Sequence, residues 1–368
     1  MDQPPSDAPT VAVTGAGGLI GRALVDALVA DPRIGTVVAV DRVALHDLPP
    51  RVPSRRADVR DRAALSTAFA DVDAVIHLAF QVDPLHDEAS MRAVNVTGSR
   101  NVAEVAAEVG VGHLVVASSA TAYGAHPDNP VPLREDAPLR APAAFPYAAH
   151  KAEVERWLAT WSAASEPRPT LTVLRPAMVA GPGVDNFITA QLDAPRFPVV
   201  RGHAPPFQFV HVDDVASAFV HVVAERVAGT YNLASEGWLS LDEVTAILGR
   251  RRLDVPEEVA HGLADLLWRA RLSPSPPGQL PFVMHPWILD VTALVATGWQ
   301  PRHSNRDALA ALAAEHTDRV ALGPLQGSRR VLRRAAALVA TGLAVWGLRR
   351  VQHARRRRDQ PSSDAPTP

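Results

Sequence analysis

Short apolar runs alternate with longer stretches of helical period through the first half of the chain. Strands that alternate with helices in this way pair in parallel, and apolar runs such as residues 74–79 suit strands that are buried on both faces. The pattern therefore predicts an α/β protein with a doubly wound parallel sheet. The expected strands are residues 10–15, 36–41, 55–61, 73–79, 113–119 and 170–176, and the expected helices are residues 19–30, 91–109 and 148–165.

Beyond Pro176 the pattern becomes irregular, with frequent proline and glycine. We expect residues 177–325 to form mainly a smaller lobe over the carboxyl ends of the strands, where a doubly wound sheet binds its ligands. Residues 1–9 are polar and proline-rich, without the basic segment and apolar core of a signal peptide, and we expect them to be disordered. The remaining residues, 326–368, are a separate basic and apolar tail.

Composition excludes several classes of protein. The 368 residues include no cysteine, which excludes disulfides, thiol catalysis and cysteine-ligated zinc, and we expect no metal site. The net charge of −2 is uneven, because residues 326–368 hold ten Arg and two Asp, which leaves −10 on the preceding 325 residues. An acidic body argues against nucleic-acid binding.

The segment VTGAGGLIG, residues 13–21, lies between the first expected strand and the first expected helix. Its glycines do not fit the spacing GxGxxG, because Ile20 stands at the last position. They fit GxxGxxG through Gly15, Gly18 and Gly21. Glycine lets the backbone approach a pyrophosphate, and the helix N-terminus presents free N–H groups. The segment predicts a dinucleotide site in a Rossmann-type domain.

Asp41 ends the second expected strand, twenty residues after Gly21. A carboxylate at this place accepts hydrogen bonds from an adenosine ribose. It also repels a 2′-phosphate, so the pattern favours NAD over NADP, although the neighbouring Arg42 weakens that preference.

Lys151 is the only lysine among 37 basic residues, and it follows Tyr147, one of three tyrosines, by four residues. Residues four apart share one face of a helix. A tyrosine that acts as a base at neutral pH needs its pKa lowered by roughly three units, or about 4 kcal/mol, and a neighbouring ammonium can do this. The pair predicts a catalytic base and its cation; a surface helix pair is the alternative.

A serine pair, Ser118 and Ser119, ends the fifth expected strand, at the sheet edge where catalytic side chains gather. We predict that Ser119 hydrogen-bonds the substrate oxygen. A serine pair at a strand end can also be only a turn former.

Together, TGxxGxxG at Thr14, the serine before ATAYG and the YxxxK segment resemble the extended short-chain dehydrogenase/reductases. More closely, the chain resembles the NAD-dependent epimerase/dehydratase family, whose best-known member is UDP-galactose 4-epimerase. The resemblance spans roughly residues 10 to 315. Further matching segments are DVRD at Asp58, HLA at His77, NVTGSRNV at Asn95, LRPAMVAGPG at Leu174 and FVHVDDVA at Phe209.

The resemblance implies a catalytic trio of Ser119, Tyr147 and Lys151, in which Ser119 and Tyr147 also contact substrate and Lys151 also binds the nicotinamide ribose. Asn95 matches a structural or water-relay asparagine. The cofactor-binding positions that it implies are Gly15, Gly18, Leu19, Ile20, Gly21, Asp41, Asp58, Val59, Ala79, Lys151 and Pro176.

Two departures from the family pattern bear on the substrate. Dehydratases usually carry Asp-Glu where this chain has Thr121-Ala122, which argues against a 4,6-dehydration that needs an extra acid and base. Epimerases of nucleotide-sugars often carry an arginine where this chain has Phe207 and Gln208.

Arg201 is our candidate for the missing pyrophosphate contact, and Asn186 is our candidate for a contact with a substrate nucleotide. We interpret His211, Asp213 and Asp214 as a helix N-terminus with capping carboxylates.

We favour an epimerase that acts on a nucleotide-sugar by transient hydride transfer to bound NAD, with Tyr147 as the base. The alternative is an NAD-dependent dehydrogenase or reductase of another alcohol or carbonyl, such as a sterol or a small molecule. A third class is a non-catalytic NAD-binding regulator, against which the intact trio counts.

The expected domains are an NAD-binding Rossmann domain over residues 10–176, which includes the catalytic helix, and the substrate lobe over residues 177–325. The resemblance implies a homodimer formed through the helices at 91–109 and 148–165.

Residues 335–348 of the tail are apolar all round and flanked by arginine pairs. Fourteen helical residues rise about 21 Å, short of the ~30 Å hydrocarbon core of a bilayer. For a cytoplasmic protein we favour contact of residues 329–358 with the inner membrane surface. The alternative is a helix docked on the enzyme itself or on a partner subunit.

Overall fold

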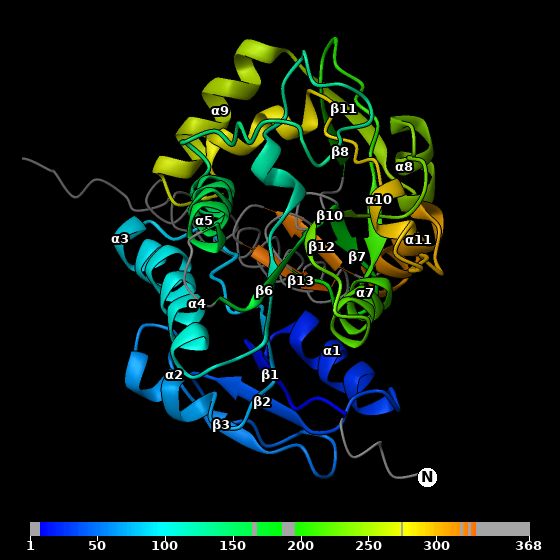
Figure 1. Cartoon of the computed structure of the whole chain (residues 1–368). Helices are drawn as coiled ribbons and strands as arrows, with labels where there is room; N and C mark the ends of the chain where they lie inside the picture. The colour runs from blue at the N-terminus through cyan, green and yellow to red at the C-terminus, as the bar shows by residue number, and fades with distance from the viewer. Residues whose placement is uncertain are drawn as a thin grey trace, which may run out of the picture.

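The computed structural model describes residues 8–163, 168–185, 196–273, 275–316, 319–322 and 325–328. Its centre is a seven-stranded sheet in the order β10-β6-β5-β4-β1-β2-β3, in which every neighbouring pair is parallel (Figure 1). The predicted α/β class and doubly wound, Rossmann-type sheet are therefore confirmed. Six strands lie where the sequence predicted them. They are β1 (Val11–Thr14), β2 (Val37–Asp41), β3 (Ser54–Arg56), β4 (Ala74–His77), β5 (His113–Ala117) and β6 (Thr170–Pro176). The third was predicted over residues 55–61 but ends at Arg56, so residues 57–61 form the loop before α2 instead.

The seventh strand, β10 (Gly229–Leu233), comes from the half of the chain where the sequence pattern predicted no strand. It pairs with β6 at the edge of the sheet, from Gly229 opposite Thr172 to Leu233 opposite Pro176. Only the last two residues of its sequence, GTYNL, are fully buried. An edge strand with so little burial does not need an apolar run, and the sequence has none. The chain therefore returns to the sheet after Pro176.

Helices cover both faces of the sheet. Helix α1 (Leu19–Ala30) and helix α7 (Val212–Ala224) pack on one face, where Leu24, Leu28 and Phe219 are fully buried. The opposite face carries α2 (Arg62–Ala68), α4 (Gly98–Glu108) and α5 (Pro146–Ser162) (Figure 1). Burial on both faces explains the continuous apolar runs of the central strands.

The predicted helix over residues 91–109 is helical but not uniform. It consists of α3 (Glu88–Arg92), a π-helical turn over Ala93–Thr97, and α4. The π turn carries Asn95, whose amide oxygen accepts from the backbone N–H of Gln81 at 2.7 Å and whose amide nitrogen donates to the carbonyl of Gln81 at 3.1 Å. The turn thereby holds the segment that follows β4.

Much of the second half of the chain forms short elements around a core that includes Phe197, Phe207 and Phe282. Two further parallel pairs join β7 to β9 and β8 to β11, and β12 and β13 pair antiparallel. The elements are β7 (Met178–Ala180), β8 (Arg196–Val200), β9 (Phe209–His211), α8 (Leu241–Leu248), β11 (Arg251–Val255), α9 (Glu257–Arg269), α10 (Thr292–Val295), α11 (Asn305–His316), β12 (Arg319–Leu322) and β13 (Leu325–Ser328).

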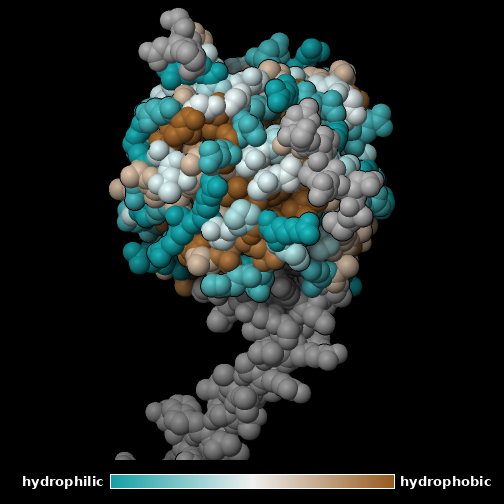
Figure 2. Space-filling model, turned by 60° about the horizontal axis from the view of Figure 1, so that its bottom comes forward, coloured by the Kyte–Doolittle hydropathy of each residue, from teal (hydrophilic) through white to brown (hydrophobic). Residues whose placement is uncertain are grey.

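The surface drawn in Figure 2 is mixed, with hydrophilic side chains around smaller hydrophobic areas. Within the described ranges, no helix combines the length and the apolar character needed to span a bilayer. The tail segment 329–358 and residues 1–7, on which we made predictions from the sequence, lie outside the described residues.

Candidate active site

A cavity of about 470 Å³ opens at the carboxyl ends of β1, β2, β4, β5 and β6. The structure brings thirteen predicted residues from separate segments of the chain into its wall. They are Gly15, Gly18, Leu19, Ile20, Gly21, Asp41, Asp58, Val59, Ala79, Ser119, Tyr147, Lys151 and Pro176.

The glycine loop forms one side of the cavity and has no room for side chains. Gly15 has a φ of +74°, and a Cβ there would lie 2.7 Å from the backbone nitrogen of Ala79. A Cβ on Gly21 would lie 2.2 Å from the carbonyl oxygen of Gly15. These glycines let helix α1 begin directly at the cavity.

The N-terminus of α1 is open. Its N-cap, Gly18, has no side chain to accept from the first turn, and that turn holds no acidic residue. The first residues of this twelve-residue helix form part of the cavity wall, and no side chain caps their amides. This arrangement fits a phosphate group, which backbone N–H groups and the helix dipole favour together.

Asp41 stands at the end of β2 beside this loop. Its Oδ2 accepts the backbone N–H of Gly17 at 3.0 Å, and its Oδ1 accepts that of Val43 at 3.3 Å. A carboxylate has about four acceptor positions, so Asp41 keeps capacity for hydroxyl groups of a ligand. Gly17, which the sequence spacing had set aside, is thus part of the site through its backbone.

Asp58 also lines the cavity, and its carboxylate forms an ion pair with Arg60. The two side chains form a fork, with Arg60 donating to Oδ1 at 2.9 Å and to Oδ2 at 2.6 Å. The Arg60 guanidinium lowers the pKa of Asp58 to about 2. The carboxylate is therefore ionised at neutral pH.

Helix α5 positions the opposite wall. It begins at Pro146, two residues before the predicted start, because proline suits the first position of a helix. Tyr147 and Lys151 follow on one buried face. The Nζ of Lys151 donates to the carbonyl oxygen of Ala117 at 2.6 Å and lies 3.5 Å from the ring centroid of Phe80.

Burial sets the electrostatics of this wall. It lowers the pKa of Lys151 to about 7, against the opposing negative charge of Glu155. It raises the pKa of Tyr147, while a hydrogen bond with the Ser119 side chain acts in the opposite direction. The sequence predicted a lowered pKa for Tyr147, but in this structure burial raises it, because desolvation disfavours the charged phenolate. Lys151 changes its charge near neutral pH, where proton transfer takes place.

Ser119 is held by the turn that follows β5. It is the N-cap of a 3₁₀ helix over Ala120–Tyr123, and its Oγ accepts from the backbone N–H of Thr121 at 3.2 Å and from the Thr121 hydroxyl at 2.9 Å. Since the Ser119 oxygen accepts these bonds, its own proton remains available for a neighbouring oxygen.

Three aromatic residues of the wall were not predicted, namely Phe80, Phe219 on α7, and Trp287. Phe80 meets the ring of Tyr147 edge-on, with centroids 5.7 Å apart and an interplanar angle of 88°. Its signal in the sequence is its place directly after Ala79. Trp287 also lines the cavity, although it lies more than a hundred residues after Pro176 in the sequence. Nothing in the sequence around Trp287 indicates this position.

The structure tests one of the two candidates for nucleotide contacts, since Asn186 falls outside the described residues. Arg201 is exposed in the turn after β8 and is not among the residues that line the cavity. Gln208 is buried and bound, because its Nε2 donates to the carbonyls of Ser235, Gly237 and Leu289.

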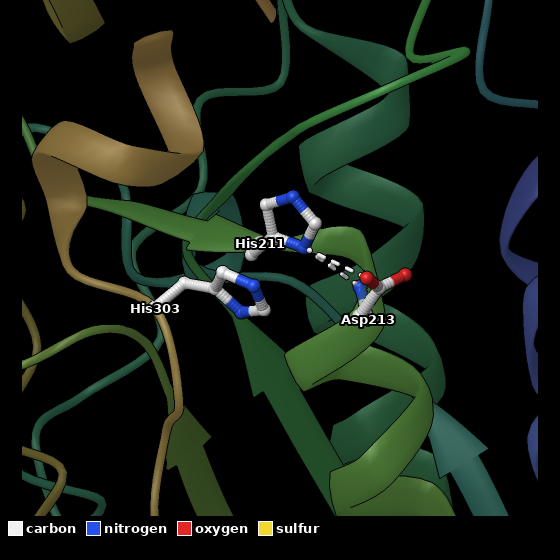
Figure 3. Close-up of side chains that lie close together, drawn as sticks. All are labelled: His211, Asp213 and His303. Carbon is white, nitrogen blue, oxygen red and sulfur yellow. Dashed lines mark hydrogen bonds and ion pairs between the residues drawn. The ribbon is translucent and has the colours of Figure 1, made fainter. Parts of the chain in front are cut away.

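His211, Asp213 and His303 form a cluster at the start of α7 (Figure 3). The predicted helix N-terminus is there, but its cap is the His211 ring, whose Nδ1 accepts the backbone N–H of Asp213 at 3.2 Å. The predicted capping carboxylate Asp214 instead accepts the backbone N–H groups of Arg302 at 3.0 Å and of His303 at 2.9 Å. Asp214 is fully buried, and it serves as the acceptor for these two backbone N–H groups of the loop before α11.

The cluster is not arranged for a metal ion. The two imidazoles are stacked, with centroids 3.9 Å apart and planes 20° apart. Nitrogen lone pairs lie in the ring planes, so stacked rings direct them side by side rather than toward one ion. The Nδ1 of His303 also lies 3.1 Å from the Asp214 carboxylate. We interpret the cluster as a cap and a contact between elements.

Comparison with known proteins adds to this geometry. A sequence model of the NAD dependent epimerase/dehydratase family matches residues 11–234. A protein of Mycobacterium tuberculosis (strain ATCC 25618 / H37Rv), described as uncharacterized, is 27% identical over 309 residues, which cover 81% of each chain.

The N-acetyl-alpha-D-glucosaminyl-diphospho-ditrans,octacis-undecaprenol 4-epimerase of Escherichia coli O157:H7 is 26% identical over 243 residues, which cover 64% of this chain and 70% of that enzyme. Among solved structures, MoeE5 in complex with UDP-glucuronic acid and NAD superimposes with a TM-score of 0.66 at 26% identity. The match covers 84% of this chain and 98% of MoeE5.

Proposed function

The chain belongs to the NAD-dependent epimerase/dehydratase family, and we propose that it is an epimerase of a nucleotide-linked sugar. One observation carries this proposal. Ser119, Tyr147 and Lys151 line one wall of a cavity whose other wall holds the open N-terminus of α1. A proton-transfer group thus faces a phosphate-binding loop across a single space.

NAD is the cofactor of this family. The residues fit it, because the glycine cradle would close if Gly15 or Gly21 carried a Cβ. The amides at the start of α1 would hold the pyrophosphate, and Asp41 would hold the adenosine ribose. When bound, NAD supplies a reversible acceptor for the hydrogen on the substrate carbon.

The chain's own residues handle the proton. In this proposal Ser119 donates a hydrogen bond to the substrate oxygen and Tyr147 takes the proton of the substrate hydroxyl. The Lys151 ammonium stabilises the tyrosinate that acts as the base. Tyr147 returns the proton once the sugar has presented its other face.

Epimerisation is favoured over dehydration by the turn that follows Ser119. Thr121 is buried and its hydroxyl is bound to Ser119, and Ala122 has no polar side chain. This turn therefore offers no carboxylate as the second acid or base that a dehydration needs.

A second candidate is an NAD-dependent oxidoreductase of a less polar alcohol or carbonyl. Apolar side chains of the wall favour it, among them Phe80, Met178 and Trp287. The positions of Gln208 and Arg201 favour it too, since Gln208 is a neutral side chain bound to backbone carbonyls and Arg201 does not line the cavity.

Cofactor retention and product stereochemistry distinguish the two. An epimerase recycles its cofactor, so the purified protein should release NAD on denaturation. It should convert UDP-galactose or UDP-N-acetylglucosamine to its epimer without net NADH. Stoichiometric NADH from an alcohol, with no epimer from a panel of nucleotide-sugars, would establish the oxidoreductase instead.

We also propose a homodimer through α4 and α5, the helices implied by the family resemblance. For the tail we propose contact of residues 329–358 with an anionic membrane surface, from its arginine clusters and apolar segment alone.

A further inference from the structure

A buried carboxylate lies directly behind the proposed catalytic residues. Glu155 follows Lys151 by four residues on the same face of α5, and its side chain is 5% exposed. An ionised carboxylate at such a depth needs partners, because burial without them is strongly unfavourable. Glu155 has partners on two other elements.

The first partner is the strand end that carries the catalytic serine. Oε1 of Glu155 accepts from the hydroxyl of Ser118. Ser118 stands between Ala117, whose carbonyl holds Lys151, and Ser119. The Glu155 carboxylate therefore anchors the short backbone segment that holds Lys151 through the Ala117 carbonyl and that carries Ser119.

The second partner is Arg175 at the end of β6. Its Nε and one terminal nitrogen donate to Oε2 of Glu155 at 2.8 and 2.6 Å. The other terminal nitrogen donates to the Tyr123 hydroxyl at 2.5 Å and to the carbonyl of Glu135 at 2.9 Å. The fork fixes the orientation of the carboxylate.

The balance of charge is uneven around this network. Lys151 and Arg175 are both buried, and the buried carboxylate of Glu155 pairs with Arg175 and acts on Lys151 through its charge. The other titratable groups near this region are His77 on β4, Tyr147 on α5, Tyr123, and Glu135. His77, Tyr147 and Tyr123 are uncharged at neutral pH in this environment. Glu135 acts on Tyr123, and its carboxylate accepts from the backbone N–H of Asn232.

We propose that Glu155 is a positioning residue of the active site, which anchors the strand end at Ser118 and supplies the negative charge that favours the protonated form of Lys151. The proposal rests on the proposed function for the role of Lys151. Of the two buried basic side chains, Arg175 cannot give up its proton in a protein, whereas Lys151 can. Loss of the Glu155 charge would therefore favour deprotonation of Lys151. Arg175 and Lys151 carry charges of the same sign, so we expect removal of the Arg175 charge to favour protonated Lys151.

The single lysine of the chain makes this measurable without a substrate. Protein labelled with [¹⁵N]lysine has one Nζ resonance, whose chemical shift against pH gives the protonation midpoint of Lys151. In Glu155→Gln we expect the midpoint to fall by about one pH unit or more. In Arg175→Met we expect it to rise. A purely structural role predicts no such pair of opposite shifts.

Glu153→Gln is the matched control, because Glu153 is on the same helix but pairs with Arg92 and Arg100 at the surface. It should leave the midpoint within a few tenths of a unit. Ser118→Ala, which removes an anchor and no charge, should do the same while slowing turnover.

Glu155→Gln removes one partner of a buried ion pair and can fail to fold. The double variant with Arg175→Met, compared with Arg175→Met alone, then isolates the loss of the carboxylate. An unchanged midpoint in folded Glu155→Gln, or no fall between those two backgrounds, overturns the proposal. Failure to epimerise any nucleotide-sugar would refute the proposed function and leave this titration intact.

Discussion

At the scale of single residues, Tyr147 and Lys151 lie on one buried face of α5, where burial raises the pKa of the phenol and lowers that of the amine. Tyr147→Phe removes the proposed base and keeps its ring, so we expect turnover to fall about 10² to 10⁴-fold with the fold retained. Steady-state kinetics on the identified substrate measures this.

Tyr231→Phe is the control, because the Tyr231 hydroxyl donates to the Ala228 carbonyl at the edge of the sheet, away from the cavity. Lys151→Arg tests the cation itself. We expect Lys151→Arg to lose turnover, because a guanidinium fork does not fit the place of an ammonium. Arginine is the residue at all 36 other Lys and Arg positions of the chain. Near-normal turnover in Tyr147→Phe would refute the mechanism.

Asp41 is the residue on which the choice of dinucleotide depends. Asp41→Ala removes both a ribose acceptor and the charge that repels a 2′-phosphate, so we expect weaker NAD binding and a smaller difference between NAD and NADP. Calorimetric titration with each dinucleotide measures this. Asp26→Ala, on the exposed face of α1, should change neither affinity. Tighter binding of NADP than NAD by the unmodified protein would contradict our interpretation of Asp41.

At the scale of elements, helix α1 depends on contact with the glycine loop. In Gly21→Ala the new methyl group would lie 2.2 Å from the Gly15 carbonyl and 2.8 Å from the Ala16 Cα, and neither backbone atom can move cheaply. We expect a lower melting temperature and weaker NAD binding. Thermal unfolding with and without NAD measures both effects.

The same substitution in α9 is a matched control. Gly262 lies within that helix, and nothing lies within 4 Å of the place where its Cβ would stand. Gly262→Ala should therefore raise stability by up to about 1 kcal/mol through helix propensity. A similar loss of stability in both variants would show that close packing of α1 is not the cause.

At the scale of the whole molecule, buried neutral histidines make stability depend on pH. Burial lowers the pKa of His77 to about 3 and that of His113 to about 4, from an ordinary value of 6.5. The unfolded chain therefore binds protons that the folded chain does not between pH 6.5 and about 4. Stability should fall as pH falls through this window, by up to about 1.4 kcal/mol per pH unit for each histidine.

Urea unfolding at several pH values between 6.5 and 5 measures the slope before most carboxylates titrate. His113→Gln should reduce the slope, because this variant removes one of the histidines whose pKa burial lowers. A slope that is equal in both proteins would mean that His113 is protonated in the folded state.

The tail is a second property of the whole molecule. We expect the intact chain to sediment with anionic vesicles, and a chain that ends at Ser328 to stay in the supernatant, because the truncation removes the arginine clusters and the apolar segment. Vesicles without anionic lipid are the control. If both chains stay soluble with anionic vesicles, the tail has no membrane role.

The sequence by itself was sufficient for the central fold and for much of the candidate site. Apolar runs specify strands buried on both faces, and glycine, aspartate and the tyrosine–lysine pair have narrow steric and chemical roles at fixed local spacing. Local spacing is visible in one dimension, so thirteen predicted residues meet in one cavity wall. A homodimer and the roles of the site residues remain predictions.

Only the tertiary structure decided the rest. Strand β10 has no apolar run, and Trp287, Arg175 and Glu155 act through partners that lie far away in the sequence. The cap of α7 is a histidine because the nearby carboxylate is needed by a loop almost ninety residues later. Such choices are made by burial and by the need of every buried donor for an acceptor, and these depend on which segments the fold brings together.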